Sequence, residues 1–235
     1  MKKLMTNGCS MTKGVYDNFN EHDAWPWQLA SLIDMDLDQL AESGSSNARI
    51  FRTTMEYLLE NTPDYAIIAW TEPYRFELPY YTGDTIRIMP HIAVPDLDES
   101  IHDLPKLRKF WYKYCNNSVT AIERTVSYIR LLEMVFKDKG IPYKMCWGLH
   151  CDYVQKGQGQ YSISKDKFPS DKTQRLDAEI AKIQTEHWMM WDSSMQVYLQ
   201  DYPKADEWGH HNKLGHTEWA TQMYRTINET LRTTR

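Results

Sequence analysis

The chain has 235 residues, of which 42% are hydrophobic and 25% are charged, and its formal net charge is −5. This is the composition of a globular α/β protein, and it excludes a disordered chain and a coiled coil. The negative charge gives no reason to expect nucleic acid or an anionic membrane as a partner. No apolar run approaches the roughly 18 residues of a membrane-spanning helix, and from the first residues we expect no signal peptide. The four cysteines lack a disulfide spacing, so we expect reduced thiols in a cytoplasmic protein.

Strands and helices are predicted to alternate along most of the chain. The run at 64–70 is the clearest strand, because it is almost continuously apolar, as in a parallel sheet covered on both faces. We expect Asp23 to cap the helix that begins at Trp25. In chain order, we predict strands at 4–9, 37–41, 64–70 and 143–149, and helices at 25–33, from about 50 to 62, 110–139, 183–199 and 212–231.

Two segments interrupt this alternation. Residues 71–109 contain five prolines and are expected to be irregular, and residues 150–185 are polar and poorly patterned. Loops of this length in a compact domain are usually functional. We therefore predict one domain over residues 1–235 with insertions at about 72–110 and 150–185.

The alternation predicts a three-layer α/β/α fold with a central, mainly parallel sheet. Ligands of such folds bind outside the carboxyl ends of the strands. The turns at 8–10, 44–47 and 70–72 should therefore share one edge of the sheet, where we expect the chemistry.

Ser10 directly follows the first predicted strand, and a serine hydroxyl needs a neighbouring base to become a nucleophile. His210 is the candidate base, and Asp206 or Glu207 could orient it, as in a catalytic triad. Each residue alone has a simpler explanation. Ser10 would then be a turn serine, and His210 a polar loop residue before the last helix.

Three short motifs together resemble the SGNH/GDSL hydrolase superfamily. Gly8-Cys9-Ser10-Met11-Thr12-Lys13-Gly14 is similar to the first block, Gly-Asp-Ser-x-Thr-x-Gly. Leu40-Ala41-Glu42-Ser43-Gly44-Ser45-Ser46-Asn47 is similar to the second block, and Glu207-Trp208-Gly209-His210 to the last block, Asp-x-x-His.

The resemblance implies a role for each matching residue. Ser10 would be the nucleophile and His210 its base, and the family spacing favours Glu207 over Asp206 as the acid. Gly44 would give a backbone N–H to the oxyanion hole. Asn47, at the end of the second block, is counted with the substrate-binding residues.

The third block departs from the family, which expects Gly-x-Asn-Asp after the third strand. This chain has Trp70-Thr71-Glu72-Pro73-Tyr74-Arg75 and no asparagine. Losing one oxyanion donor can reduce the rate by about 10²–10³. Thr71 or Arg75 could take its place, although Arg75 could equally pair with Glu72 or Glu77 on the surface.

A metal site is a weaker interpretation. His210, His211 and His216, with His150 and Cys151, match no structural zinc spacing. Cys9 could replace Ser10 as the nucleophile, but a cysteine at a strand end is more often a small buried residue. We predict no metal and no cofactor.

The leading hypothesis is an esterase or acetylesterase whose substrate is a small-molecule or carbohydrate ester. Tyr74, Phe76, Tyr80 and Tyr81 of the first insertion would shape its pocket. The main alternative is a non-catalytic binding module that kept the fold and lost the third block. A more distant alternative is a flavodoxin-like domain that binds phosphate or a nucleotide at a helix N-terminus. The sequence predicts neither a nucleic-acid nor a membrane partner, and it carries no prediction of oligomeric state.

Overall fold

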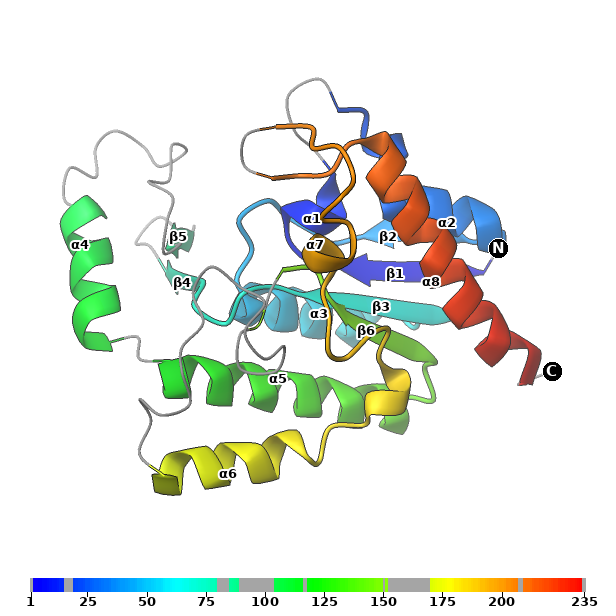
Figure 1. Cartoon of the computed structure of the whole chain (residues 1–235). Helices are drawn as coiled ribbons and strands as arrows, with labels where there is room; N and C mark the ends of the chain where they lie inside the picture. Colours follow the sequence, from blue (N-terminus) through cyan, green and yellow to red (C-terminus); the bar gives the residue numbers. More distant parts are fainter. Residues whose placement is uncertain are drawn as a thin grey trace.

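The structure is a computed structural model, and Figure 1 shows its course. It describes residues 2–14, 19–79, 85–88, 104–115, 118–149, 151, 170–206 and 209–233.

The centre of the molecule is a four-stranded sheet in the order β2-β1-β3-β6. All three neighbouring pairs are parallel, which confirms the predicted α/β class. The strands are β1 (Lys3–Asn7), β2 (Asp36–Gln39), β3 (Tyr65–Trp70) and β6 (Tyr143–Trp147).

β3 shows why the sheet needs two helical layers. All six of its residues are buried, and successive side chains of a strand point to opposite faces. Tyr65, Ile67 and Ala69 belong to one hydrophobic core, whereas Ala66, Ile68 and Trp70 belong to the other.

Each face of the sheet is covered by its own helices (Figure 1). One core is filled from α2 (Trp25–Ile33), α8 (Lys213–Thr233), the short α1 (Ser10–Lys13) and α7 (Met195–Tyr198). The other is filled from α3 (Asn47–Glu60), α5 (Ser118–Asp138) and α6 (Ser170–Ile180).

The start of α2 differs from the prediction. Its N-cap residue is Ala24, which makes no side-chain cap, and Pro26 occupies the first turn, where a missing N–H is tolerated. Asp23 instead belongs to a 3₁₀ turn, Glu21–Asp23, and pairs with Lys213 at the start of α8. The acidic side chain therefore joins two helices and caps neither.

The first insertion contains regular structure, so the prediction of an irregular segment is wrong here. β4 (Phe76–Pro79) and β5 (Thr85–Ile88) form an antiparallel hairpin. α4 (Leu104–Phe110) follows and continues into a π-helical turn, Trp111–Cys115, before α5 begins at Ser118. The two short strands have few residues and lie among prolines, so their periodicity is weak in the sequence.

The helix predicted at 183–199 is also wrong. The chain forms a 3₁₀ turn, Thr185–His187, and then runs along the free edge of β6, with isolated parallel bridges from Met145 to Trp188 and from Trp147 to Ser194. Only α7 is helical. The apolar run is buried by packing Trp188 against Trp147, with ring centroids 5.2 Å apart, and not by a helical face.

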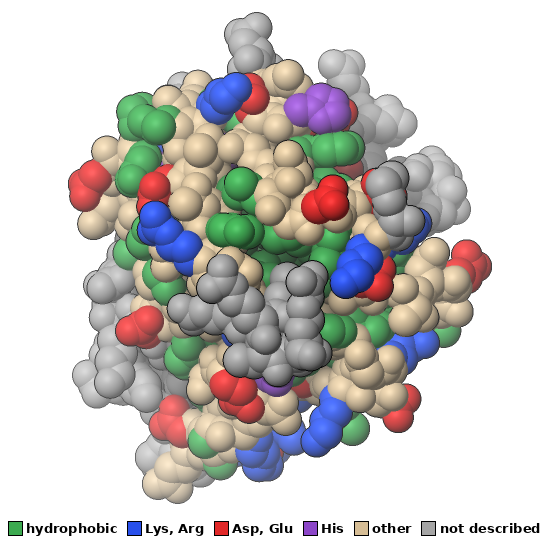
Figure 2. All heavy atoms as spheres, turned by 90° about the vertical axis from the view of Figure 1, so that its right-hand side faces the viewer, with side chains coloured by type: hydrophobic (Ala, Val, Ile, Leu, Met, Phe, Trp, Pro, Cys, Tyr) green, Lys and Arg blue, Asp and Glu red, His purple; other side chains and the backbone are tan. Residues whose placement is uncertain are grey.

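Figure 2 views the molecule from the side on which both chain ends lie in Figure 1. Side chains of both charges are scattered over this face among hydrophobic ones. In the part of the chain that the structure describes, no helix has the length and apolar character needed to cross a membrane.

Candidate active site

Ser10 lies at the turn between β1 and α1. The turn is tight at Gly8, where a Cβ atom would lie 2.2 Å from Thr12 Oγ1, so only glycine fits. Cys9 is fully buried, as expected for a small core residue at this position. Ser10 follows it as the first residue of α1.

His210 meets Ser10 from the other end of the chain. Its Nε2 lies 2.8 Å from Ser10 Oγ, although 200 positions separate the two residues. This is the proximity predicted from the two turns. Hydrogen-bond contact with an imidazole is the arrangement that lets a base take a serine proton.

Asp206 holds the opposite side of the His210 ring. Its Oδ2 lies 2.5 Å from Nδ1, and its Oδ1 accepts a hydrogen bond from the His210 backbone N–H at 3.0 Å. The family spacing favoured Glu207, which lies outside the described residues. The carboxylate seen on Nδ1 is therefore that of Asp206, one position earlier.

The loop that carries Asp206 and His210 is closed by its own backbone. Lys204 and His211 form an antiparallel bridge, and the Ala205 N–H donates to the His210 carbonyl at 2.7 Å. Gly209 has a φ of 83°, a left-handed conformation that favours glycine. The chain can therefore double back and place the Asp206 carboxylate beside His210.

His211 and His216 are fully buried behind this loop. Burial lowers the pKa of His211 to about 4, helped by the nearby Lys204 ammonium, and burial lowers the pKa of His216 to about 3. His216 Nδ1 accepts a hydrogen bond from the Trp25 N–H at 3.2 Å. Both rings are therefore neutral structural groups that join α8 and the His210 loop to the rest of the fold.

The candidate metal ligands do not gather into one group among the described residues. Within the described ranges, no three His, Cys, Asp or Glu side chains are grouped so that they could hold a metal ion. His150 lies outside these ranges, and Cys151 is buried in the core on the α5 side of the sheet.

The second block lies against the first. Lys13 Nζ contacts Glu42 Oε2 at 2.7 Å, and the Glu42 N–H donates to the Gly8 carbonyl at 3.3 Å. Gly44 follows with a φ of 74°, again a conformation that suits glycine. The loop that carries Gly44 is thus fastened to the turn that carries Ser10.

Asn47 has a structural position and is not available as a donor to substrate. Its Oδ1 accepts from the Thr71 N–H at 2.8 Å, and its Nδ2 donates to the Thr71 carbonyl and to Thr125 Oγ1. Both ends of the buried amide are therefore occupied. Asn47 joins the second-block turn to the end of β3.

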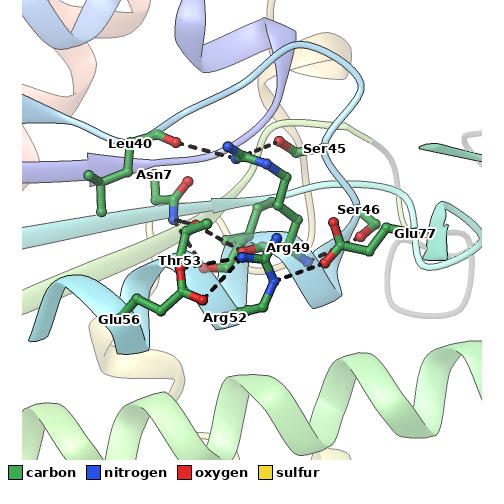
Figure 3. Close-up of polar contacts among 10 residues, drawn as sticks. Asn7, Leu40, Ser45, Ser46, Arg49, Arg52, Thr53, Glu56 and Glu77 are labelled. Atoms are coloured by element: carbon green, nitrogen blue, oxygen red, sulfur yellow. Dashed lines mark hydrogen bonds and ion pairs between the residues drawn. The ribbon is translucent and has the colours of Figure 1, made fainter. Parts of the chain in front are cut away.

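The α3 helix anchors both turns (Figure 3). Asn7, the last residue of β1, donates from Nδ2 to Ile50 O, Thr53 Oγ1 and Thr54 Oγ1 within 3.0 Å, and its Oδ1 accepts the Gly8 N–H at 2.8 Å. Sequence reasoning missed Asn7. The available signal was a buried-type position holding a polar residue directly before a glycine turn.

Arg49 makes the corresponding contact with the second-block loop. Its Nη1 lies 3.5 Å from the Leu40 carbonyl and 3.3 Å from Ser45 Oγ, while the Ser46 hydroxyl accepts the Arg49 N–H. The guanidinium therefore joins the two ends of the loop that contains Gly44 (Figure 3).

The third block presents Thr71 and Arg75 differently. Thr71 is fully buried, and its Oγ1 makes no hydrogen bond with the described residues. Arg75 pairs with Glu72 at 3.3 Å, the ion-pair alternative considered from the sequence. Thr71 thus keeps an uncommitted hydroxyl at the end of β3, the strand that pairs with β1.

Two surface hollows lie elsewhere among the described residues. One, of about 540 Å³, lies between α2 and α8 and includes Trp27 and Gln28, and the other, of about 670 Å³, lies between α5 and α6 and includes Arg124. Neither lining includes Ser10 or His210.

The comparisons with known proteins agree with this fold. The sequence matches DUF6071, described as a family of unknown function, over residues 5–222, and no curated protein matches it. Similar solved structures include the psychrotrophic esterase EstA from Pseudoalteromonas sp., with 11% identity, 99% of this chain and 100% of that chain covered, and a TM-score of 0.52.

Two further solved structures are similar to this chain to about the same degree. The acetyl xylan esterase AlAXEase is 10% identical over 96% of this chain and 99% of its own, with a TM-score of 0.51. A lipolytic G-D-S-L family protein from Veillonella parvula is 12% identical over 97% of each chain, with a TM-score of 0.51. The predicted SGNH/GDSL hydrolase fold is therefore confirmed.

Proposed function

Because the chain belongs to DUF6071, a family of unknown function, its sequence relatives do not name a reaction, and we propose from its site that it is a serine hydrolase that cleaves an ester or acetyl group. The observation that carries the proposal is the continuous contact from Ser10 Oγ to His210 Nε2 and from His210 Nδ1 to Asp206.

The three side chains have complementary roles in this reaction. Ser10 Oγ attacks the carbonyl carbon while His210 Nε2 takes its proton, and His210 then returns that proton to the leaving alcohol. Asp206 keeps the proton of the neutral ring on Nδ1 and stabilises the imidazolium that forms. Water repeats the sequence on the acyl-enzyme and releases the acid.

The tetrahedral intermediate needs hydrogen-bond donors for its oxyanion. We assign the first to the Ser10 backbone N–H at the start of α1 and the second to the Gly44 N–H. The buried Thr71 hydroxyl, which has no acceptor among the described residues, is the third donor and replaces the missing third-block asparagine. The Arg75 guanidinium remains with Glu72.

The proposed substrate is a small-molecule or carbohydrate ester. Two of the similar structures are an acetyl xylan esterase and a cold-adapted esterase, the latter solved after inhibition by monoethylphosphonate. These are properties of those proteins, and they support the choice of acetyl esters and phosphonates as the first probes of this chain.

The test is labelling by a fluorophosphonate together with turnover of short acetyl and butyryl esters. We expect labelling and hydrolysis by the wild-type chain and by Ser31→Ala, whose serine is exposed on α2, and neither by Ser10→Ala. If wild-type turnover equals the Ser10→Ala background on every ester and no label is incorporated, the hydrolase proposal is wrong.

The second candidate is a non-catalytic binding module, which the missing third-block asparagine favours. Under that alternative, the folded wild-type chain binds an ester without cleaving it, and Ser10→Ala binds it equally well. Calorimetric titration of a non-hydrolysed ester against both chains separates this outcome from failure to fold.

A further inference from the structure

Arg124 lies beside the base of the first insertion. It comes from the first turns of α5, and its guanidinium carbon lies 5.0 Å from the centre of the Phe76 ring at the start of β4. Phe76 in turn stacks on Trp111, with centroids 4.0 Å apart. A guanidinium over an aromatic face is held in place by cation–π attraction, so the side chain is pre-positioned.

Arg124 is a half-buried cation. Among the described residues it makes no ion pair, and burial lowers its pKa. Glu72 pairs with Arg75, and one carboxylate oxygen of Glu77 pairs with Arg52. A half-buried cation without a partner is unfavourable unless a ligand supplies the missing charge.

A second arginine lies in the same neighbourhood. The charges of Arg75, Arg108 and Arg124 all act on the buried Tyr112 hydroxyl, which itself donates to the Tyr74 carbonyl. Within the described part of the chain, Arg108 has no ion-pair partner either. The Arg75–Glu72 pair is neutral as a unit, so among the described residues Arg108 and Arg124 are the cations here without an ion-pair partner.

The buried groups without partners around this charge are mostly donors. Arg124 Nη2 and Trp111 Nε1 are each buried without an acceptor among the described residues, while Glu77 Oε2 is buried without a donor. Buried donors are normally satisfied. These two unsatisfied donors, one of them on Arg124 itself, fit a ligand with acceptor oxygens and a negative charge.

This cluster is connected to the edge of the sheet that carries Ser10. Thr125, next to Arg124, accepts a hydrogen bond from Asn47, and Asn47 binds the backbone of Thr71 at the end of β3. β3 pairs directly with β1, which leads into Ser10. The Arg124 side chain also lines the open hollow between α5 and α6, so it is not sealed in the core.

We propose that Arg124, supported by Arg108 and the Phe76–Trp111 stack, binds an acidic group of the substrate, so that this chain prefers esters carrying a carboxylate or a phosphate. The inference rests on the proposed hydrolase function, because it takes the ligand to be the substrate. Binding of the acidic group itself needs only the folded chain. Stacked rings beside two arginines favour an acid attached to a planar group.

The experiment measures binding to the Ser10→Ala chain, which removes turnover from the result. The probes are para-acetoxybenzoate and its neutral methyl ester, the longer 4-(para-acetoxyphenyl)butanoate and its methyl ester, and para-acetoxyphenyl phosphate. Calorimetry at pH 7.5 keeps every acid ionised. The two carboxylates differ in reach from the ester, and the phosphate distinguishes the two kinds of acidic group.

We expect at least one acid to bind about tenfold or more tightly than its methyl ester, as for a hydrogen bond to a charged group. Arg124→Gln should bring this ratio close to one, whereas Arg225→Gln, which removes an exposed charge from α8, should leave it unchanged. Equal binding of every acid and its ester, or an unchanged ratio in Arg124→Gln, overturns the proposal.

Folding and catalysis are separated from this result. The melting temperature of each variant detects a misfolded chain, and Arg108→Gln then provides a second variant in which the ratio should fall. Acid binding by a chain that hydrolyses nothing supports the anion site and rejects the hydrolase. Hydrolysis without any preference for the acid supports the hydrolase and rejects the anion site.

Discussion

Replacing Asn7 with aspartate should destabilise the protein at pH 8 and much less at pH 4. The side chain is fully buried, and its amide donates to three oxygens while accepting the Gly8 N–H. An ionised aspartate keeps the acceptor but turns a second negative oxygen toward Ile50 O and the two threonine hydroxyls. A protonated aspartate restores one donor, so the acid form resembles asparagine.

The magnitude follows from the burial. Burial raises the pKa of a carboxyl by about 3–5 units, and the retained Gly8 hydrogen bond argues for the lower end. About 3 units at about 1.4 kcal/mol each give a loss of about 4 kcal/mol at pH 8. Domains of this kind are stable by about 5–15 kcal/mol in total, so the variant should be close to unfolding there.

The direction with pH is fixed by linkage. The folded-state pKa lies above the unfolded value of about 3.9, so the stability is fully present below pH 4 and is lost as the pH rises toward about 7. Denaturant unfolding of the variant and of the wild-type chain between pH 4 and 8 measures the difference. Asn20→Asp is the matched control, since Asn20 is exposed. A loss that is the same at every pH would refute the reasoning.

Three other substitutions test the neighbouring structure. Asp206→Asn should reduce ester turnover by about 10⁴, by analogy with a triad whose acid is neutralised, while Glu207→Gln should not; the reverse order in the measured kcat would return the acid role to Glu207. The wild-type chain should lose stability between pH 6.5 and 4, because the pKa of His211 falls to about 4 on folding and the folded state therefore resists protonation of this ring. His211→Gln should reduce this loss, whereas His22→Gln, at an exposed site, should not. The same dependence of the unfolding free energy on pH in both variants would contradict this. Gly8→Ala should lower the melting temperature by several degrees, because its Cβ would meet Thr12 Oγ1 at 2.2 Å; an unchanged melting temperature would show that the turn relaxes.

Periodicity was sufficient to predict the four strands and their parallel sheet. The apolar run at 64–70 indicates a strand buried on both faces, and the turns after the first three predicted strands follow at the same edge. The rule that ligands bind at this edge then brings Ser10 toward His210 without any knowledge of their distance. This part of the site depends on local pattern and on topology, both of which the sequence contains.

The parts that could not be predicted depend on where a side chain points after folding. Asp206 and Glu207 are neighbours in the sequence, and the family spacing favours Glu207, whereas the folded loop brings the Asp206 carboxylate to His210. Asn47 has a residue type suited to an oxyanion donor, but the backbone of Thr71 occupies it. Both contacts depend on the tertiary structure, and the spacing of residues in the sequence does not reveal them.

The segment at 183–199 shows a different limit. The sequence predicts one helix here, yet the segment runs along the free edge of β6 and its Trp188 packs against Trp147. An apolar run indicates that a segment will be buried, but it does not indicate which element the segment will pack against. An uncovered strand edge competes with helix formation, and here the edge prevails.

The docking of α8 on α2 has a consequence for how the protein is made. Trp25 binds His216 across 191 positions, and Gln28 accepts from Thr217 across 189. A ribosome therefore exposes β1 and the apolar side of α2 long before their partners are synthesised, and such distant contacts form slowly. Until then that surface is open to chaperones or to aggregation. A chain interrupted before residue 210 would hold Ser10 without His210, so under the proposed mechanism an unfinished chain would be inactive.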